Sequence, residues 1–117
     1  MVFFTGDLVN NVANEMEHFT DVFDKIKAKY GVFSILGNHD YGDYVQWASP
    51  QDKAENMENL KDVHRKMGWD LLLNENRLLP INGEEVAIIG VENYSESPRF
   101  SKYGDLEKAY KLSLIHI

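Results

Sequence analysis

The stretch SILGNHDYGDY, residues 34–44, places an amide, an imidazole and a carboxylate side by side directly after an apolar run. Residues 32–36 (VFSIL) are typical of a buried strand that ends at Gly37, and Asn38, His39 and Asp40 follow it. A polar turn is the simplest explanation of such a cluster. Whether these three residues do more depends on what else the chain provides.

A second apolar run with the same kind of ending lies upstream. Residues 2–4 (VFF) predict a short strand that stops at Gly6 and Asp7. Between the two strands, apolar residues recur at steps of three and four over residues 12–30, which predicts one amphipathic helix. Strand, helix and strand with a right-handed crossover give a parallel pair. Asp7 and Asn38 are then expected at one carboxyl edge, where open α/β sheets bind ligands.

The remaining elements follow from cap and turn residues. Ser49 is a suitable N-cap for a helix with Pro50 at its first position, and Asn82-Gly83 between two β-rich runs predicts a hairpin. We also expect a strand at residues 70–74, a loop at 94–105 and a third helix from 105–110. His64 falls on the apolar stripe of the second helix and is predicted to be a half-buried packing residue.

The composition limits the classes of function. The chain has 117 residues, the length of one domain, and a formal net charge of −7. That charge argues against binding to a nucleic-acid backbone or an anionic membrane surface. The absence of cysteine excludes disulfides, thiolate zinc sites and cysteine nucleophiles. The apolar runs are too short to span a bilayer, and we expect no targeting segment within these residues.

The clustered residues carry the chemistry of a metal site. A carboxylate such as Asp7 can bridge two cations, and the amide of Asn38 offers a neutral oxygen ligand. His39 is better placed to act on a substrate, while Asp40 is close enough to fix the tautomer of a neighbouring imidazole.

At this point a family resemblance is evident. GDLVNN (6–11) followed by LGNHDY (36–41) resembles the G-D-x-x-[DN] and G-N-H-[DE] blocks of the calcineurin-like metallophosphoesterases. The resemblance extends over residues 2–111 and is greatest to a bacterial branch that is often membrane-associated or exported. It implies an α/β fold that forms part of a four-layer α/β/β/α sandwich with mixed sheets. It also implies hydrolysis of phosphate mono- or diesters with two divalent ions, Mn, Fe or Zn.

The resemblance assigns a role to each matched position. Asp7 would bridge the two metals, Asn38 would bind the second metal, and His39 would protonate the leaving alcohol oxygen with Asp40 orienting it. Supporting positions around them would be Gly6, Gly37 and Asn10, although Asn10 could equally serve a turn or a helix cap. Tyr41, Tyr44 and Trp47 could wall a substrate pocket or simply pack the loop.

Two departures from the family pattern restrict this reading. The family's upstream D-x-H block and its downstream G-H-x-H block have no counterpart here, so residues 1–111 are expected to be a partial, inactive domain. Residues 112–117 (LSLIHI) match the translation of a transposase end sequence used in shotgun libraries, and we interpret them as adapter sequence rather than a native strand. The alternative function is a non-catalytic α/β module whose GNHD loop binds a partner or a single cation.

Overall fold

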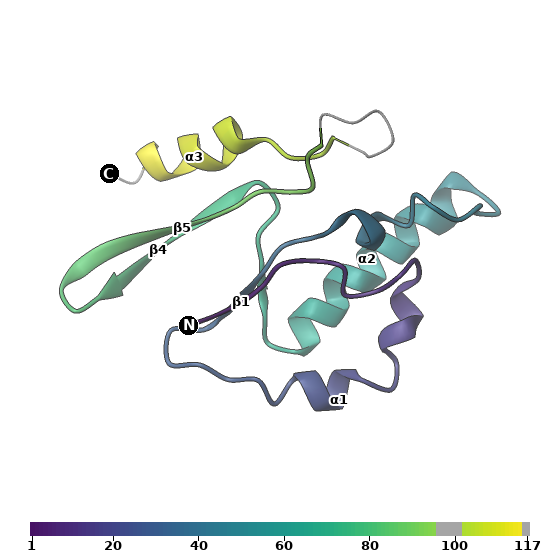
Figure 1. Ribbon diagram of the computed structural model, residues 1–117, viewed down its shortest axis with the longest axis horizontal. Helices are drawn as coiled ribbons and strands as arrows, with labels where there is room; N and C mark the ends of the chain where they lie inside the picture. The colour runs from purple at the N-terminus through teal and green to yellow at the C-terminus, as the bar shows by residue number, and fades with distance from the viewer. Residues whose placement is uncertain (96–101, 116–117) are drawn as a thin grey trace. The chain divides into compact units, whose positions relative to one another are not determined.

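The computed structural model describes residues 1–95 and 102–115, without the side chains of residues 111–115. The chain divides into two compact units, Met1–Leu71 and Leu72–Ile117, and each is described by itself. Figure 1 shows that each unit contains both helix and strand. The predicted α/β class is therefore confirmed. No helix in the described residues is both long and apolar enough to cross a membrane.

The first unit is built on a small parallel sheet. Its strands are β1 (Val2–Phe4), β2 (Val32–Ser34) and β3 (Asp70–Leu71), in the order β1-β2-β3. β1 and β2 run parallel in the register Val2 to Val32, as the strand–helix–strand pattern predicts. The carboxyl ends of β1 and β2 therefore lie at the same edge of the sheet, and the polar residues of both loops start there.

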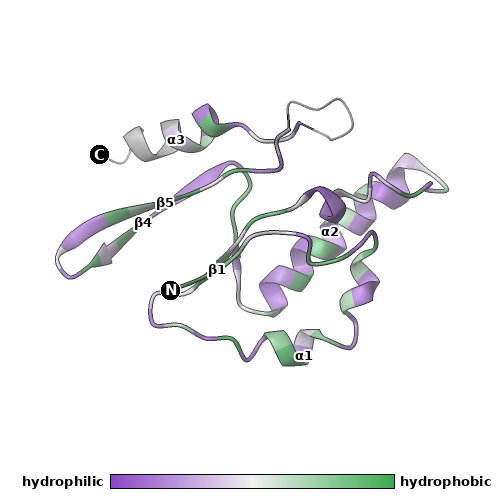
Figure 2. Cartoon of the chain, in the orientation of Figure 1, coloured by the Kyte–Doolittle hydropathy of each residue, from purple (hydrophilic) through white to green (hydrophobic). Residues whose placement is uncertain are grey.

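The main helix of the first unit is α2 (Pro50–Lys66), which begins where the sequence predicts. The hydroxyl of Ser49 accepts a hydrogen bond from the Asp52 N–H at 3.1 Å, and Pro50 occupies the first helical position. Figure 2 shows apolar and polar segments alternating around this helix, which is the pattern of an amphipathic helix. Leu60 on its inner face is fully buried.

His64 of α2 is more deeply buried than expected. The side chain has no exposed surface, its Nδ1 lies 2.8 Å from the Ser34 Oγ, and its ring packs against Trp69 at 5.8 Å between centroids. Nε2 has no hydrogen-bond partner among the described residues. The prediction of a half-buried position was wrong because the helix stripe faces the sheet directly at this residue.

The predicted continuous helix over residues 12–30 is also wrong. In its place are a 3₁₀ turn, η1 (Ala13–Met16), and a single helical turn, α1 (Thr20–Phe23). Ala13 and Met16 are buried, whereas the later residues of the predicted apolar stripe include Phe19 and Ile26, which are exposed (53% and 36%). A short helix gains most of its stability from packing, and β-branched and aromatic residues have low helix propensity, so these residues do not form one continuous helix.

The second unit is a β-hairpin followed by a helix. β4 (Glu75–Ile81) and β5 (Glu84–Gly90) pair antiparallel, and the predicted Asn82-Gly83 turn joins them. Both turn residues have positive φ, 52° and 82°, as a type I′ turn requires. α3 (Leu106–Ile115) confirms the predicted third helix. Its first N–H groups include that of Lys108, which donates to the Asp105 carboxylate at 2.9 Å.

The strand predicted over residues 70–74 is shorter, because β3 ends at Leu71. Asn74, predicted as the last residue of that strand, has a different role. It has a left-handed φ of 54° and is buried. Its Oδ1 accepts hydrogen bonds from the N–H groups of Glu92 (3.0 Å) and Asp105 (2.8 Å), and its Nδ2 donates to the Glu92 carboxylate (2.8 Å). Asn74 therefore holds together the two ends of the segment between β5 and α3.

Two expectations fall wholly or partly outside the described residues. Residues 96–101 of the predicted loop at 94–105 lie outside them. The backbone of residues 112–115 is helical, as part of α3, rather than a strand. The interpretation of residues 112–117 as adapter sequence stays a prediction.

Candidate functional site

The loop after β1 and the loop after β2 touch each other through glycines. A Cβ atom on Gly6 would lie 2.5 Å from the backbone nitrogen of Gly37, and one on Gly37 would overlap the Asp7 carboxylate. Gly6 also has a φ of 105°, a conformation that L side chains rarely adopt. Glycine at both positions therefore allows the loop after β1 to lie directly against the loop after β2.

Asp40 joins these loops through hydrogen bonds to the backbone. It lies in the 3₁₀ turn η2 (Asn38–Tyr41) and has no exposed surface. Its Oδ2 accepts from the N–H groups of Asp7 and Gly37, both at 2.8 Å, and its Oδ1 accepts from the Val9 N–H at 3.2 Å. Burial raises the pKa of the Asp40 carboxyl above its usual range, although these three hydrogen bonds oppose the shift.

This geometry changes the role expected for Asp40. The expected partner of its carboxylate was the imidazole of His39, but both of its oxygens accept from backbone N–H groups of two loops. The imidazole is hydrogen-bonded instead to the carbonyl oxygen of Asn10, 3.0 Å from His39 Nδ1. Because a carbonyl only accepts, Nδ1 carries the hydrogen, and Nε2 is the nitrogen left for other partners.

Asp7 and His39 are connected directly. The backbone N–H of His39 donates to Asp7 Oδ1 at 3.0 Å. Asp7 has a left-handed φ of 57°, which aspartate tolerates better than most residues, and its side chain is exposed. The carboxylate of Asp7 and the backbone of the GNHD turn therefore lie together at the carboxyl edge of β1 and β2.

Asn38 is half-buried, and its amide has a protein partner on one side. Its Nδ2 donates to the hydroxyl of Tyr44 at 3.0 Å. The ring of Tyr44 also lies beside the ring of His39, with centroids 5.0 Å apart and planes inclined by 52°. Tyr44 thus contacts both Asn38 and His39. The sequence alone left open whether Tyr44 walls a pocket or packs the loop.

Two residues that sequence reasoning missed hold the GDLVNN loop. Asn56 of α2 is buried. Its Nδ2 donates to the Asn11 carbonyl at 3.4 Å, and its Oδ1 accepts from the N–H of Ala13, just after the loop, at 2.8 Å. The carboxylate of Glu15 accepts from the N–H groups of Asn10, Asn11 and Val12 at 2.8–3.0 Å. Burial alone would raise the pKa of Glu15, but these hydrogen bonds outweigh it and lower the pKa. The sequence could have indicated that Asn56 is buried, because it lies one helical turn before Leu60 on the apolar face of α2.

The donor set suits a divalent cation but is incomplete within the described residues. Asp7 offers carboxylate oxygen and Asn38 amide oxygen, the ligands that hard cations prefer. No cluster of three or more histidine, aspartate or glutamate side chains occurs in the part of the chain that the structure describes. These residues can therefore contribute to a metal site, with further ligands needed to complete it.

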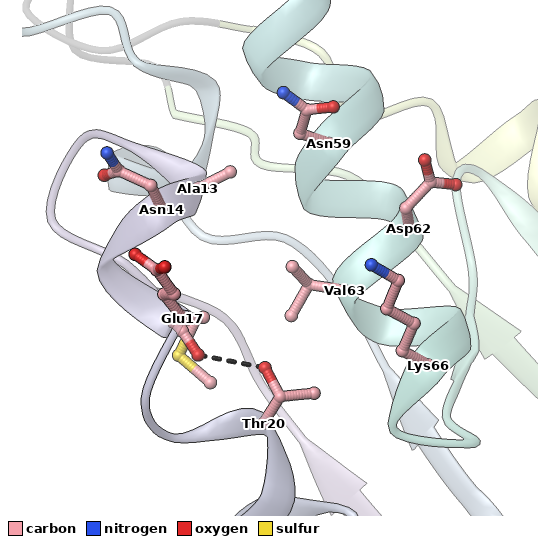
Figure 3. Close-up of a pocket in the computed structure, with 9 residues that line it drawn as sticks. Ala13, Asn14, Glu17, Thr20, Asn59, Asp62, Val63 and Lys66 are labelled. Carbon is pink, nitrogen blue, oxygen red and sulfur yellow. Dashed lines mark hydrogen bonds between the residues drawn. The ribbon is translucent and has the colours of Figure 1, made fainter.

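A separate pocket lies between η1 and α2 in the first unit (Figure 3). Its volume is about 450 Å³, and a hydrogen bond from the Thr20 hydroxyl to the Met16 carbonyl lies along one wall. Its lining carries charges of both signs, from Glu17, Asp62 and Lys66. None of Asp7, Asn38 and His39 lines it, so this pocket is not the site built by the two loops.

Comparison with known proteins gives the family. The sequence model of the calcineurin-like phosphoesterases matches residues 1–113. The chain is also similar to the metallophosphoesterase YkoQ of Bacillus subtilis (strain 168), with 31% identity over 116 residues, which is 96% of this chain and 40% of that protein. No solved structure matches. The chain spans less than half of the length of this relative. The chain therefore belongs to the calcineurin-like phosphoesterase family, whose members depend on metal ions.

Proposed function

We propose that this chain is part of a metal-dependent phosphoesterase that hydrolyses phosphate mono- or diesters at a dinuclear metal centre. The observation that supports it most is the joint placement of Asp7, Asn38 and His39 at the carboxyl edge of two parallel strands. The proposed whole-protein fold is the four-layer sandwich of mixed sheets, of which residues 1–111 form a part. The metals are proposed to be manganese, iron or zinc, since oxygen and nitrogen ligands suit all three.

The roles follow from the atoms that each residue presents. Asp7 and Asn38 would hold the ions through oxygen. When bound, two divalent ions supply neutralisation of the phosphoryl charge and an activated water nucleophile. Asn10 holds His39 by its Nδ1–H, so Nε2 is free to donate a proton to the leaving oxygen. Asp40 acts through the backbone, because it fixes the loops that carry Asp7 and His39.

Residues 1–117 are proposed to be inactive alone. Each of two ions needs about five or six ligands, so a dinuclear centre needs about ten ligands, of which few are shared by both ions. Asp7 and Asn38 cannot supply that number. The remaining ligands would come from other parts of a longer protein. This proposal agrees with the 40% coverage of YkoQ, a relative about two and a half times as long.

The test is hydrolysis of an aryl phosphate by the full-length protein with and without Mn²⁺. Wild type should show Mn²⁺-stimulated turnover, and His39→Ala should lower kcat by roughly 10²- to 10⁴-fold, the usual contribution of a general acid. His18→Ala is the matched control, because His18 is exposed and lies outside the site. Mn²⁺ binding without turnover in wild type would favour the alternative, a non-catalytic cation-binding module.

A further inference from the structure

We propose that Tyr44 is a positioning residue for the metal ligand Asn38 and for His39. The inference rests on the proposed function, because it concerns the same site. Tyr44 contacts both residues through different parts of its side chain: the hydroxyl faces the Asn38 amide, and the ring faces the imidazole. The two contacts have separate consequences and can be removed separately by substitution.

The hydroxyl of Tyr44 contacts the NH₂ end of the Asn38 amide. A side-chain amide has one oxygen, which can bind a cation, and one NH₂ group, which cannot. Since Nδ2 donates to the Tyr44 hydroxyl at 3.0 Å, Oδ1 is turned away from Tyr44 and remains available as a ligand. Residues that hydrogen-bond a metal ligand, without binding the metal themselves, commonly change metal affinity or activity by about 10- to 100-fold.

The ring restricts the orientation of His39. One edge of the imidazole is fixed by the bond between Nδ1 and the Asn10 carbonyl. The Tyr44 ring lies against it at 5.0 Å between centroids, inclined by 52°, within the range of favourable aromatic contacts. With both contacts in place, rotation of the imidazole is limited and Nε2 keeps one direction, which proton transfer to a leaving oxygen requires.

The loop that carries Tyr44 is anchored on both sides. Trp47 Nε1 donates to the Gly42 carbonyl at 2.7 Å, and Gly42 has a left-handed φ of 68° with no room for a Cβ beside the Trp47 ring. Asp43 forms an ion pair with Lys53 of α2. Tyr44 itself is 43% exposed, so its placement comes from this anchored loop and from its two contacts rather than from burial in the core.

The experiment compares two variants of the full-length protein. Tyr44→Phe keeps the ring and removes the hydroxyl, whereas Tyr44→Leu removes both. Binding of Mn²⁺ alone is measured by calorimetry, and kcat and KM for an aryl phosphate are measured at saturating Mn²⁺. We expect both variants to bind Mn²⁺ about 10-fold more weakly than wild type. Only Tyr44→Leu should also lower kcat by about 10-fold, with its thermal unfolding temperature close to that of wild type.

The matched control is Tyr30→Phe. Tyr30 precedes β2, at the opposite end of the parallel strands, and should leave Mn²⁺ affinity and kcat unchanged. Unchanged Mn²⁺ affinity in Tyr44→Phe would overturn the role of the hydroxyl, and equal kcat in the Phe and Leu variants would overturn the role of the ring. If wild type itself neither binds Mn²⁺ nor turns over substrate, the proposed function fails and this inference fails with it. An active wild type with unaffected variants contradicts only the inference about Tyr44.

Discussion

His64 makes the stability of the first unit dependent on pH. Burial lowers the pKa of this imidazole from 6.5 to about 4, because the charged form loses its hydration. Above pH 6.5 the ring is neutral in the folded and unfolded states, so it adds no pH dependence. Below pH 6.5 the unfolded chain takes up a proton that the folded chain does not, and stability falls until the folded pKa is reached.

The expected size follows from linkage. Each unit of pKa difference corresponds to about 1.4 kcal/mol, so His64 should lower the free energy of unfolding by about 3 kcal/mol between pH 6.5 and 4. Urea unfolding of wild type and His64→Leu across this range measures the difference, and other titrating groups cancel in the comparison. Parallel pH profiles for the two proteins would contradict the assignment.

At the residue scale, the motifs predict which residues lie near one another, but not how the two loops that carry them are held together. The residue types and order in GDLVNN and GNHDY identify Asp7, Asn38 and His39 as neighbours at a strand edge, and the structure places the loops together. The function of Asp40 could not be read in this way. Its partners are backbone N–H groups up to 33 residues away, which every residue except proline carries, so the sequence contains no mark of them.

Among the elements, α2 supports the candidate site through one polar side chain. Asn56 accepts from the Ala13 N–H at 2.8 Å and donates to the Asn11 carbonyl at 3.4 Å. Asn56→Ala should lower the free energy of unfolding by about 2 kcal/mol, because it leaves a buried N–H without its acceptor. The amide of Ala13 should also exchange faster with solvent, which hydrogen-exchange NMR detects.

Asn59→Ala provides the comparison for this change within the same helix. Asn59 is exposed, and a substitution to alanine at an exposed helical position should alter stability by about 0.5 kcal/mol or less. If both substitutions cost the same, Asn56 does not hold the GDLVNN loop and its contact has no energetic importance.

The elements also show where pattern reading succeeds. α2 and the β4–β5 hairpin were predicted well because local chemistry defines them, with Ser49 and Pro50 at the start of the helix and Asn82-Gly83 in the turn. Residues 12–30 have the same helical periodicity, yet they form two separate short turns, η1 and α1, and of these only η1 contains buried residues. Periodicity records which face could be buried, whereas a partner surface decides whether it is.

At the scale of the whole molecule, the first unit, taken by itself, has an open strand edge and exposed apolar side chains. Among the described residues β1 pairs only with β2, so its other edge has free backbone groups. Phe3, Phe19 and Val22 are each more than half exposed, at 57%, 53% and 58%. An open strand edge together with exposed apolar side chains favours association between chains. The net charge of −7 on each chain opposes that association by repulsion.

We therefore predict that the isolated 117-residue chain self-associates, and that Val22→Glu shifts the midpoint of association to about 10-fold higher concentration. Burial of a valine side chain contributes about 1.5 kcal/mol, which corresponds to that factor. Gln51→Glu adds the same charge at an exposed position on α2 and separates the effect of charge from that of the apolar surface. Sedimentation velocity over a range of concentrations measures the midpoint for each protein. A monomeric wild-type chain at every concentration, or equal shifts in the two variants, would show that this surface does not drive association.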